Sequence, residues 1–203
     1  LYLNLFFAAV RALAAVIGDG LEVITLDVRI VPPSPDGGGR PPLNHNQWLR
    51  GALRYLDSWL KSHGSNLHDC PLSVDAAYVS PANVALVKEL KMVLVGKLSV
   101  NRIVKGNVWG EVEGVAAANI FAGISIMLNP QKCRVLRGEE GVEYFRNTVY
   151  VKSLKASILM ATFIHGEKML LYFSTNPDMK MITLRNIIRF RWQLERVFWI
   201  LKQ

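Results

Sequence analysis

The strongest constraint on the fold is a strand, helix and strand pattern between residues 71 and 98. An apolar run ends in Ser-Val-Asp75, which predicts a short buried strand with an aspartate at its carboxyl end. Ser80 and Pro81 then supply the N-cap and the first-turn proline of a helix, and Met92–Leu98 is typical of a second buried strand. This order predicts an α/β sheet with a right-handed parallel crossover, and ligands bind such sheets at the carboxyl ends of strands.

The segments before this pattern predict a hairpin and a helix. Two apolar runs surround a Gly-Asp19-Gly turn and extend to Val31, which predicts a β-hairpin. Residues 32–42 are rich in proline and glycine, so they leave no room for another strand pair. A helix is expected to begin at Asn46, because apolar residues from Leu49 onward keep helical spacing. Gly64 follows its expected end.

After Asn107 the sequence pattern changes to short strand-like runs separated by glycine and asparagine. Asn147–Lys155 alternates between polar and apolar residues, which predicts a strand, and further strands are expected up to Phe173. We therefore expect residues 1–106 to form the first part of a core, 107–166 a mostly β insertion, and 167–203 the last strand and helix.

The last helix carries one acid among several cations. Ile188, Arg191, Glu195 and Lys202 are spaced i, i+3, i+7 and i+14, which places them on one helical face. One interpretation is a functional face. The alternative is a core helix with a solvated charged stripe, because i, i+4 pairs such as Arg191 and Glu195 are common on protein surfaces.

The chain has 203 residues and a net charge of +8, which predicts an acidic partner, with nucleic acid as the first candidate. An anionic membrane surface also fits the charge. However, every apolar run is shorter than the ~20 residues of a spanning helix or is broken by a polar residue, so we expect no membrane.

The cysteine content predicts a reducing cytoplasm, because only Cys70 and Cys133 occur and they give no disulfide framework. His63, His68 and Cys70 lie close in sequence and raise the question of zinc. No fourth ligand stands at a familiar spacing, so a loop before a strand is the default interpretation.

The motifs taken in order resemble the DDE-type cut-and-paste insertion-sequence transposases, and the resemblance covers nearly the whole chain. The final-helix signature of that family is tyrosine, two residues, arginine, three residues, glutamate, six residues and lysine. Arg191, Glu195 and Lys202 fit this spacing, whereas Ile188 stands where the tyrosine belongs and removes a stacking or hydrogen-bonding contact. The Leu171–Asp178 run is also typical of the family, and Ser-Val-Asp-Ala-Ala-Tyr78 is similar to the segment around its second catalytic aspartate.

The resemblance implies an RNase-H-like mixed sheet flanked by helices, with a β insertion before the last helix. It implies a transposase catalytic domain that cuts and joins DNA with two Mg²⁺ or Mn²⁺ ions, held in part by Asp75 and Glu195. The DNA phosphates would contact cations of the last helix, which are Arg189, Arg191, Arg196 and Lys202. The expected partner is DNA at transposon ends, with a homodimer on DNA as one arrangement to test. For Asp75, the competing explanation is a helix-capping or turn aspartate.

The first of the three acids of this family lies on the first strand, before two antiparallel strands. The hairpin that ends at Val31 corresponds to those two strands, so the first strand and its acid are expected upstream of Leu1. Asp27 could serve only if two strands fitted between Val31 and the helix at Asn46, where prolines and glycines forbid them. We therefore expect a truncated copy that binds DNA without cutting it efficiently.

Three alternatives remain open. The chain could be a basic DNA-binding protein without catalysis, which would use the cations of the last helix. It could be another nuclease of the RNase-H-like fold, because that fold hosts several chemistries. A membrane-associated basic protein is the least favoured.

Overall fold

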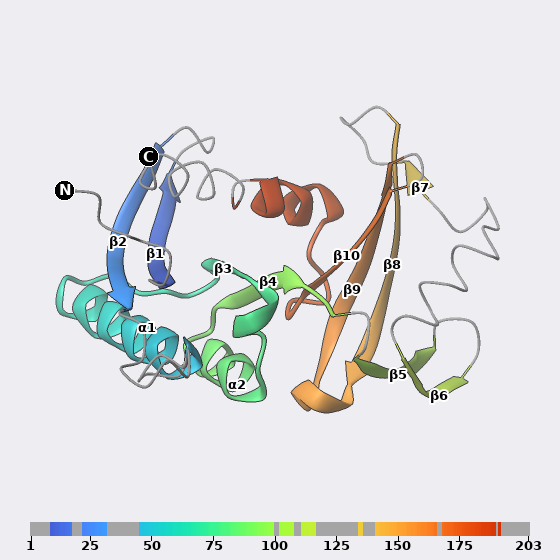
Figure 1. Cartoon of the computed structure of the whole chain (residues 1–203), viewed down its shortest axis with the longest axis horizontal. Helices are drawn as coiled ribbons and strands as arrows, with labels where there is room; N and C mark the ends of the chain where they lie inside the picture. Colours follow the sequence, from blue (N-terminus) through green and yellow to red (C-terminus); the bar gives the residue numbers. More distant parts are fainter. Residues whose placement is uncertain are drawn as a thin grey trace. The chain divides into compact units, whose positions relative to one another are not determined.

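The computed structural model describes residues 9–17, 22–31, 45–99, 102–107, 111–116, 134–135, 141–165, 168–189 and 191 (Figure 1). The chain divides into two compact units, each described by itself below. One unit comprises Leu1–Ser65 with Arg189–Gln203, and the other comprises Asn66–Ile188. The predicted domain boundaries near residues 106 and 166 stay predictions.

The first unit contains the predicted hairpin. Strands β1 (Ala9–Ile17) and β2 (Glu22–Val31) pair antiparallel, and the register shifts by one residue beside Leu13. Asp27 lies opposite Leu13 at that irregularity. The antiparallel pairing confirms the hairpin that the two apolar runs predict.

The first unit also contains helix α1 (His45–Ser62), which confirms the helix predicted from Asn46. Leu49 and Leu53, which are four residues apart, are buried on it, as expected from their helical spacing. On the same helix, Lys61 Nζ lies 2.7 Å from Asp57 Oδ2, four residues earlier. The helix ends before Gly64, whose φ of +74° is a conformation that suits glycine.

The second unit is built on one mixed sheet of eight strands. Its strand order is β3 (Pro71–Val74), β4 (Val93–Lys97), β10 (Lys168–Ser174), β9 (Ala156–His165), β8 (Val142–Val151), β5 (Ile103–Asn107) and β6 (Glu111–Ala116), with β7 (Arg134–Val135) paired to β8. Strands β3 and β4 are parallel, whereas the other pairs are antiparallel. The mixed α/β class is therefore confirmed.

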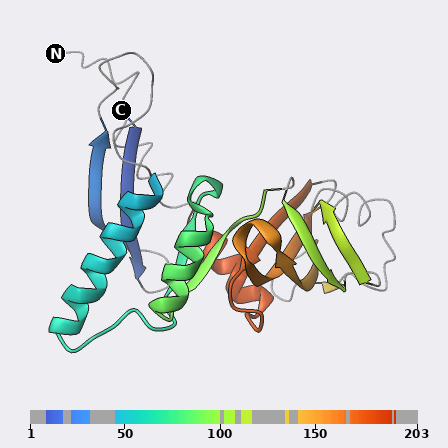
Figure 2. The same cartoon turned by 90° about the horizontal axis from the view of Figure 1, so that it is seen from below.

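Strands β3 and β4 are joined by helix α2 (Pro81–Glu89), as the sequence predicts. The Ser80 side chain accepts a hydrogen bond from the Asn83 backbone N–H at 3.3 Å, so Ser80 is the N-cap and Pro81 the first helical residue. Residues 181–189 form a second helix, and Figure 1 shows it and α2 on opposite sides of β4, which Figure 2 views from the side of α2. Consequently Leu94 and Val95, which point to opposite faces of β4, are both fully buried.

The core of this unit lies between the helix at 181–189 and one face of the sheet. The helix contributes Met181, Leu184 and Ile188, which are all buried. They pack with residues of four strands: Val95, Tyr172, Leu159, Ala161, Phe163 and Val142. Near this cluster, the Arg185 guanidinium lies 5.5 Å from the centre of the Phe163 ring, which adds a cation–π contact.

Two features differ from the sequence predictions. The alternation from Asn147 predicts a strand to Lys155, but β8 ends at Val151 and residues 152–154 form a 3₁₀ turn. The turn ends at Lys155 with a φ of 53°, so the chain reverses there into β9. Strand β5 lies outside the predicted elements, and it pairs with both β6 and β8.

We expect a Gly96→Ala substitution in β4 to destabilise the protein by about 1–3 kcal/mol through overpacking. An added Cβ at this position would lie 2.9 Å from the Val74 carbonyl oxygen and 3.2 Å from Phe173 Cε1. The matched control is Gly51→Ala in α1, where no atom lies within 4 Å of the added Cβ. That change should stabilise the helix by up to about 1 kcal/mol. Urea denaturation of both variants measures the difference, and equal effects would contradict this account.

Candidate functional site

Asp75 lies directly after β3, at the carboxyl end of a parallel strand, as predicted. Its backbone is extended, with φ −72° and ψ 159°, and its carbonyl accepts the Tyr78 N–H at 2.9 Å in the 3₁₀ turn Ala76–Tyr78. Asp75 is exposed, and its side chain makes no capping hydrogen bond to that turn. Asp75 is therefore the residue at which this turn begins.

The position of Asp75 is held from both sides. Before it, Val74 is buried and pairs in register with Gly96 of β4. After it, the buried Asn83 side chain donates a hydrogen bond to the Tyr78 carbonyl at 2.7 Å. A strand on one side and a capped helix on the other thus fix the backbone that carries the carboxylate.

The segment between β10 and the helix at 181–189 is a structured turn. The Asn176 N–H donates to Ser174 Oγ at 3.1 Å, and the Asn176 side-chain oxygen accepts the Asp178 N–H at 2.9 Å. Arg146 of β8 donates to the Pro177 carbonyl at 2.9 Å. Thr175 exchanges hydrogen bonds with Leu94, through its N–H and its hydroxyl, both at 2.9 Å. These contacts determine where the last helix begins.

The described part of the last helix contains three residues of the predicted motif region. Ile188 is only 2% exposed and packs in the core, where the family signature has tyrosine. Arg189 is exposed and Arg191 is half-buried. Glu195, Arg196 and Lys202 lie outside the described residues, so the structure does not test whether Glu195 approaches Asp75.

The structure describes the side chains of some, but not all, of the other residues that the sequence raised as candidates. His63 Nδ1 lies 2.8 Å from the Trp59 carbonyl oxygen, and the two rings stack at 4.3 Å, so His63 contacts the end of its own helix. Cys70 is exposed. Asp19 lies outside the described residues, as does the Asp27 side chain. Among the side chains that the structure describes, no three His, Cys, Asp or Glu residues gather as a metal-binding group.

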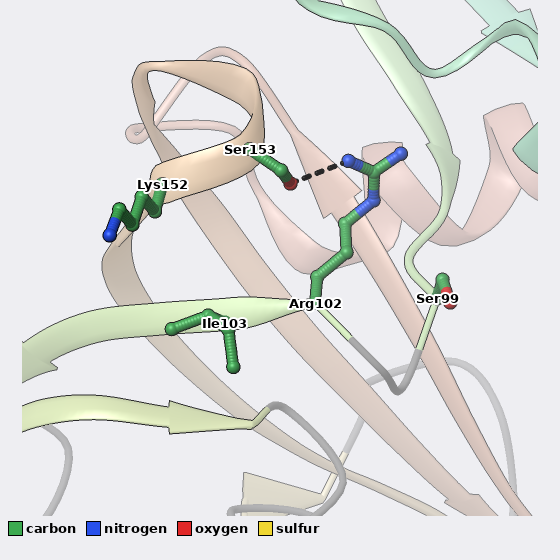
Figure 3. Close-up of a pocket in the computed structure, with 5 residues that line it drawn as sticks. All are labelled: Ser99, Arg102, Ile103, Lys152 and Ser153. Carbon is green, nitrogen blue, oxygen red and sulfur yellow. Dashed lines mark hydrogen bonds between the residues drawn. The ribbon is translucent and has the colours of Figure 1, made fainter.

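A cavity that the sequence analysis missed lies beside the turn between β8 and β9. It has a volume of about 390 Å³ and is lined by Ser99, Arg102, Ile103, Lys152 and Ser153 (Figure 3). Arg102 Nη1 donates to Ser153 Oγ and Nη2 donates to the Val79 carbonyl, both at 2.7 Å. Partial burial lowers the pKa of the Arg102 guanidinium below its ordinary value. Arg102 and Ser153 are 51 positions apart, so no local sequence pattern joins them.

Comparisons of the chain with protein-family models, curated proteins and solved structures found no match. Within the described ranges, no helix has both the length and the apolar content needed to cross a bilayer.

We expect Leu184→Ala to destabilise the unit by about 2–5 kcal/mol, because it empties a fully buried position under the last helix. Ile182→Ala on the same helix is the control. Ile182 is 37% exposed, so its truncation should cost less than about 1 kcal/mol. Urea denaturation followed by circular dichroism compares the two variants. A similar loss in both would show that the packing of Leu184 does not anchor the helix.

Proposed function

We propose that the chain is a DDE-type catalytic domain that acts on DNA phosphodiesters, with an RNase-H-like arrangement of its sheet. The observation that supports this most directly is the placement of Asp75. It is an exposed carboxylate at the carboxyl end of a parallel strand, on a backbone fixed by β3 and α2, and its side chain does not cap the turn that follows. Ligand-binding side chains of α/β sheets occupy this position.

The last helix supports the second half of the proposal. Met181, Leu184 and Ile188 are spaced i, i+3 and i+7, and all are buried. In the sequence, Arg191 and Glu195 continue this stripe at three and seven residues beyond Ile188. In this proposal the stripe of core residues continues into a functional face that carries a cation and an acid.

In this proposal Asp75 and Glu195 hold the metal, because Mg²⁺ and Mn²⁺ prefer carboxylate oxygens. When bound, two such ions activate the attacking oxygen and stabilise the leaving oxygen of an in-line displacement at phosphorus. Arg191 and Lys202 orient the DNA phosphates through charge-assisted hydrogen bonds, and Arg189 and Arg196 add positive charge beside them.

A basic DNA-binding protein without catalysis is the second candidate. The net charge of +8 and the exposed Arg189 favour DNA binding whether or not a metal is held. Salt-sensitive DNA binding that Glu195→Gln leaves unchanged, without metal-dependent cutting, would support this candidate. Strand-transfer products would instead separate a transposase from another nuclease of the same fold. Cutting that Asp27→Ala abolishes would identify Asp27 as the first acid.

The decisive test is calorimetric titration of Mn²⁺ into the wild-type chain and into Asp75→Asn and Glu195→Gln. Each variant should lose metal binding, because each removes a charged oxygen ligand. Asp69→Asn is the matched control: Asp69 is an exposed aspartate two residues before β3, and its φ of 59° is one that asparagine tolerates. This control should bind Mn²⁺ as the wild type does.

Other outcomes of the titration are also informative. Two Mn²⁺ ions per chain would indicate a third acid in the site. Equal binding by the wild type, Asp75→Asn and Glu195→Gln would contradict the proposed ligands. No binding at all would leave the non-catalytic DNA-binding protein as the better description.

A further inference from the structure

The cavity beside the β8–β9 turn brings together side chains from two segments distant in sequence. Ser99, Arg102 and Ile103 come from the end of β4 and the start of β5, whereas Lys152 and Ser153 come from the 3₁₀ turn. Figure 3 shows the Arg102 side chain extending to Ser153, with Ile103 on the neighbouring strand and Lys152 on the turn above it. The described residues that line the cavity provide two cations and two hydroxyl groups, and none of these described residues is a carboxylate.

The hydrogen-bond partners of the Arg102 guanidinium are neutral groups. Its guanidinium donates to a hydroxyl oxygen and to a backbone carbonyl, and its described surroundings provide no carboxylate partner. These two bonds use two of the five guanidinium N–H groups, which leaves donors for a ligand. Because a partly buried charge is more stable beside an opposite charge, the cavity favours an anion.

The turn carries both Lys152 and Ser153 on the wall of the cavity; Figure 3 shows the Ser153 hydroxyl directed toward Arg102 and the Lys152 amine directed toward the outer side. The Lys155 N–H donates to the Lys152 carbonyl at 3.2 Å and closes the turn, and both Lys152 and Ser153 are exposed. The Ser153 hydroxyl oxygen accepts from Arg102, so its own hydrogen is directed elsewhere and can be donated. Arg, Lys and Ser side chains all contact phosphate oxygens in complexes of proteins with DNA.

We propose that this cavity binds a phosphate group of the DNA backbone. Arg102 and Lys152 supply the positive charge, and the hydroxyl groups of Ser99 and Ser153 donate to the phosphate oxygens. Ile103 is 41% exposed and forms an apolar wall against the neighbouring deoxyribose. The phosphate site follows from the cavity itself, whereas DNA as the source of the phosphate rests on the proposed function.

The test measures binding of a fluorescein-labelled DNA duplex of about 30 base pairs, by fluorescence anisotropy, between about 50 and 200 mM NaCl. Lys152→Gln is the key variant, because it removes a charge and leaves both Arg102 hydrogen bonds intact. It should weaken binding roughly tenfold at low salt and reduce the slope of log affinity against log salt by about one. Arg102→Gln should do the same, and Arg102→Lys should recover part of the loss because it restores the charge.

The control is Lys180→Gln, which removes an exposed lysine of the same unit that does not line the cavity. Its affinity and salt slope should match those of the wild type. The proposal is overturned if Lys152→Gln behaves as Lys180→Gln does while the wild type binds DNA. In that case the proposed DNA-acting function stands and the site fails.

A second measurement separates the site from the source of the phosphate. Inorganic phosphate is titrated into the wild-type chain while the amide NMR signals of Lys152 and Ser153 are followed. If these signals shift but the wild type binds no duplex, the phosphate site stands and DNA as its source is overturned, together with the proposed function. Binding to phosphatidylglycerol vesicles that Lys152→Gln abolishes, without DNA binding, would assign the phosphate to a lipid and also overturn the DNA source.

Discussion

The placement of β4 is the constraint on which the rest of the second unit depends. Strand β3 lies along one edge of β4 and β10 along the other, while α2 and the helix at 181–189 cover its two faces. At Gly96 the backbone of β3 and the ring of Phe173 come so close that only a hydrogen atom fits. Because Asp75 follows β3 and the helix at 181–189 follows β10, a shift of β4 would move both Asp75 and the start of that helix.

The elements that the sequence predicted correctly depend on local signals. The hairpin around Asp19, the helix from Asn46 and the Ser80 cap follow from turn residues and periodicity within a few positions. The placement of Asp75 could be predicted for the same reason, because it needs only the end of one strand. The pairing of β10 with β4, the early end of β8 and the cavity around Arg102 could not be predicted. The strand pairing and the cavity depend on contacts between residues far apart in the chain. The end of β8 depends on a local turn that requires a positive φ at Lys155, which is not a glycine.

The two proposed sites differ in how their charges interact with DNA phosphates. Carboxylates such as Asp75 repel DNA phosphates unless a divalent cation lies between them. Arg102 and Lys152 attract a phosphate directly and need no ion. The chain carries a net charge of +8, so it attracts DNA overall even though carboxylates at the proposed metal site repel it locally. In these proposals the cavity would contribute to holding DNA, whereas the acids would act only with metal bound.

The hairpin of β8 and β9 sets a fixed length within the second unit. Its strands pair over ten residues each, from Val142 and His165 at one end to Val151 and Ala156 at the turn. At ~3.3 Å per residue, the turn that lines the cavity and the opposite end of the hairpin at Val142 are about 30 Å apart. The hairpin therefore sets the distance between these two places. A change by an even number of residues in each strand would alter this distance and keep the core side chains on the same face, whereas an odd change would turn them to the opposite face.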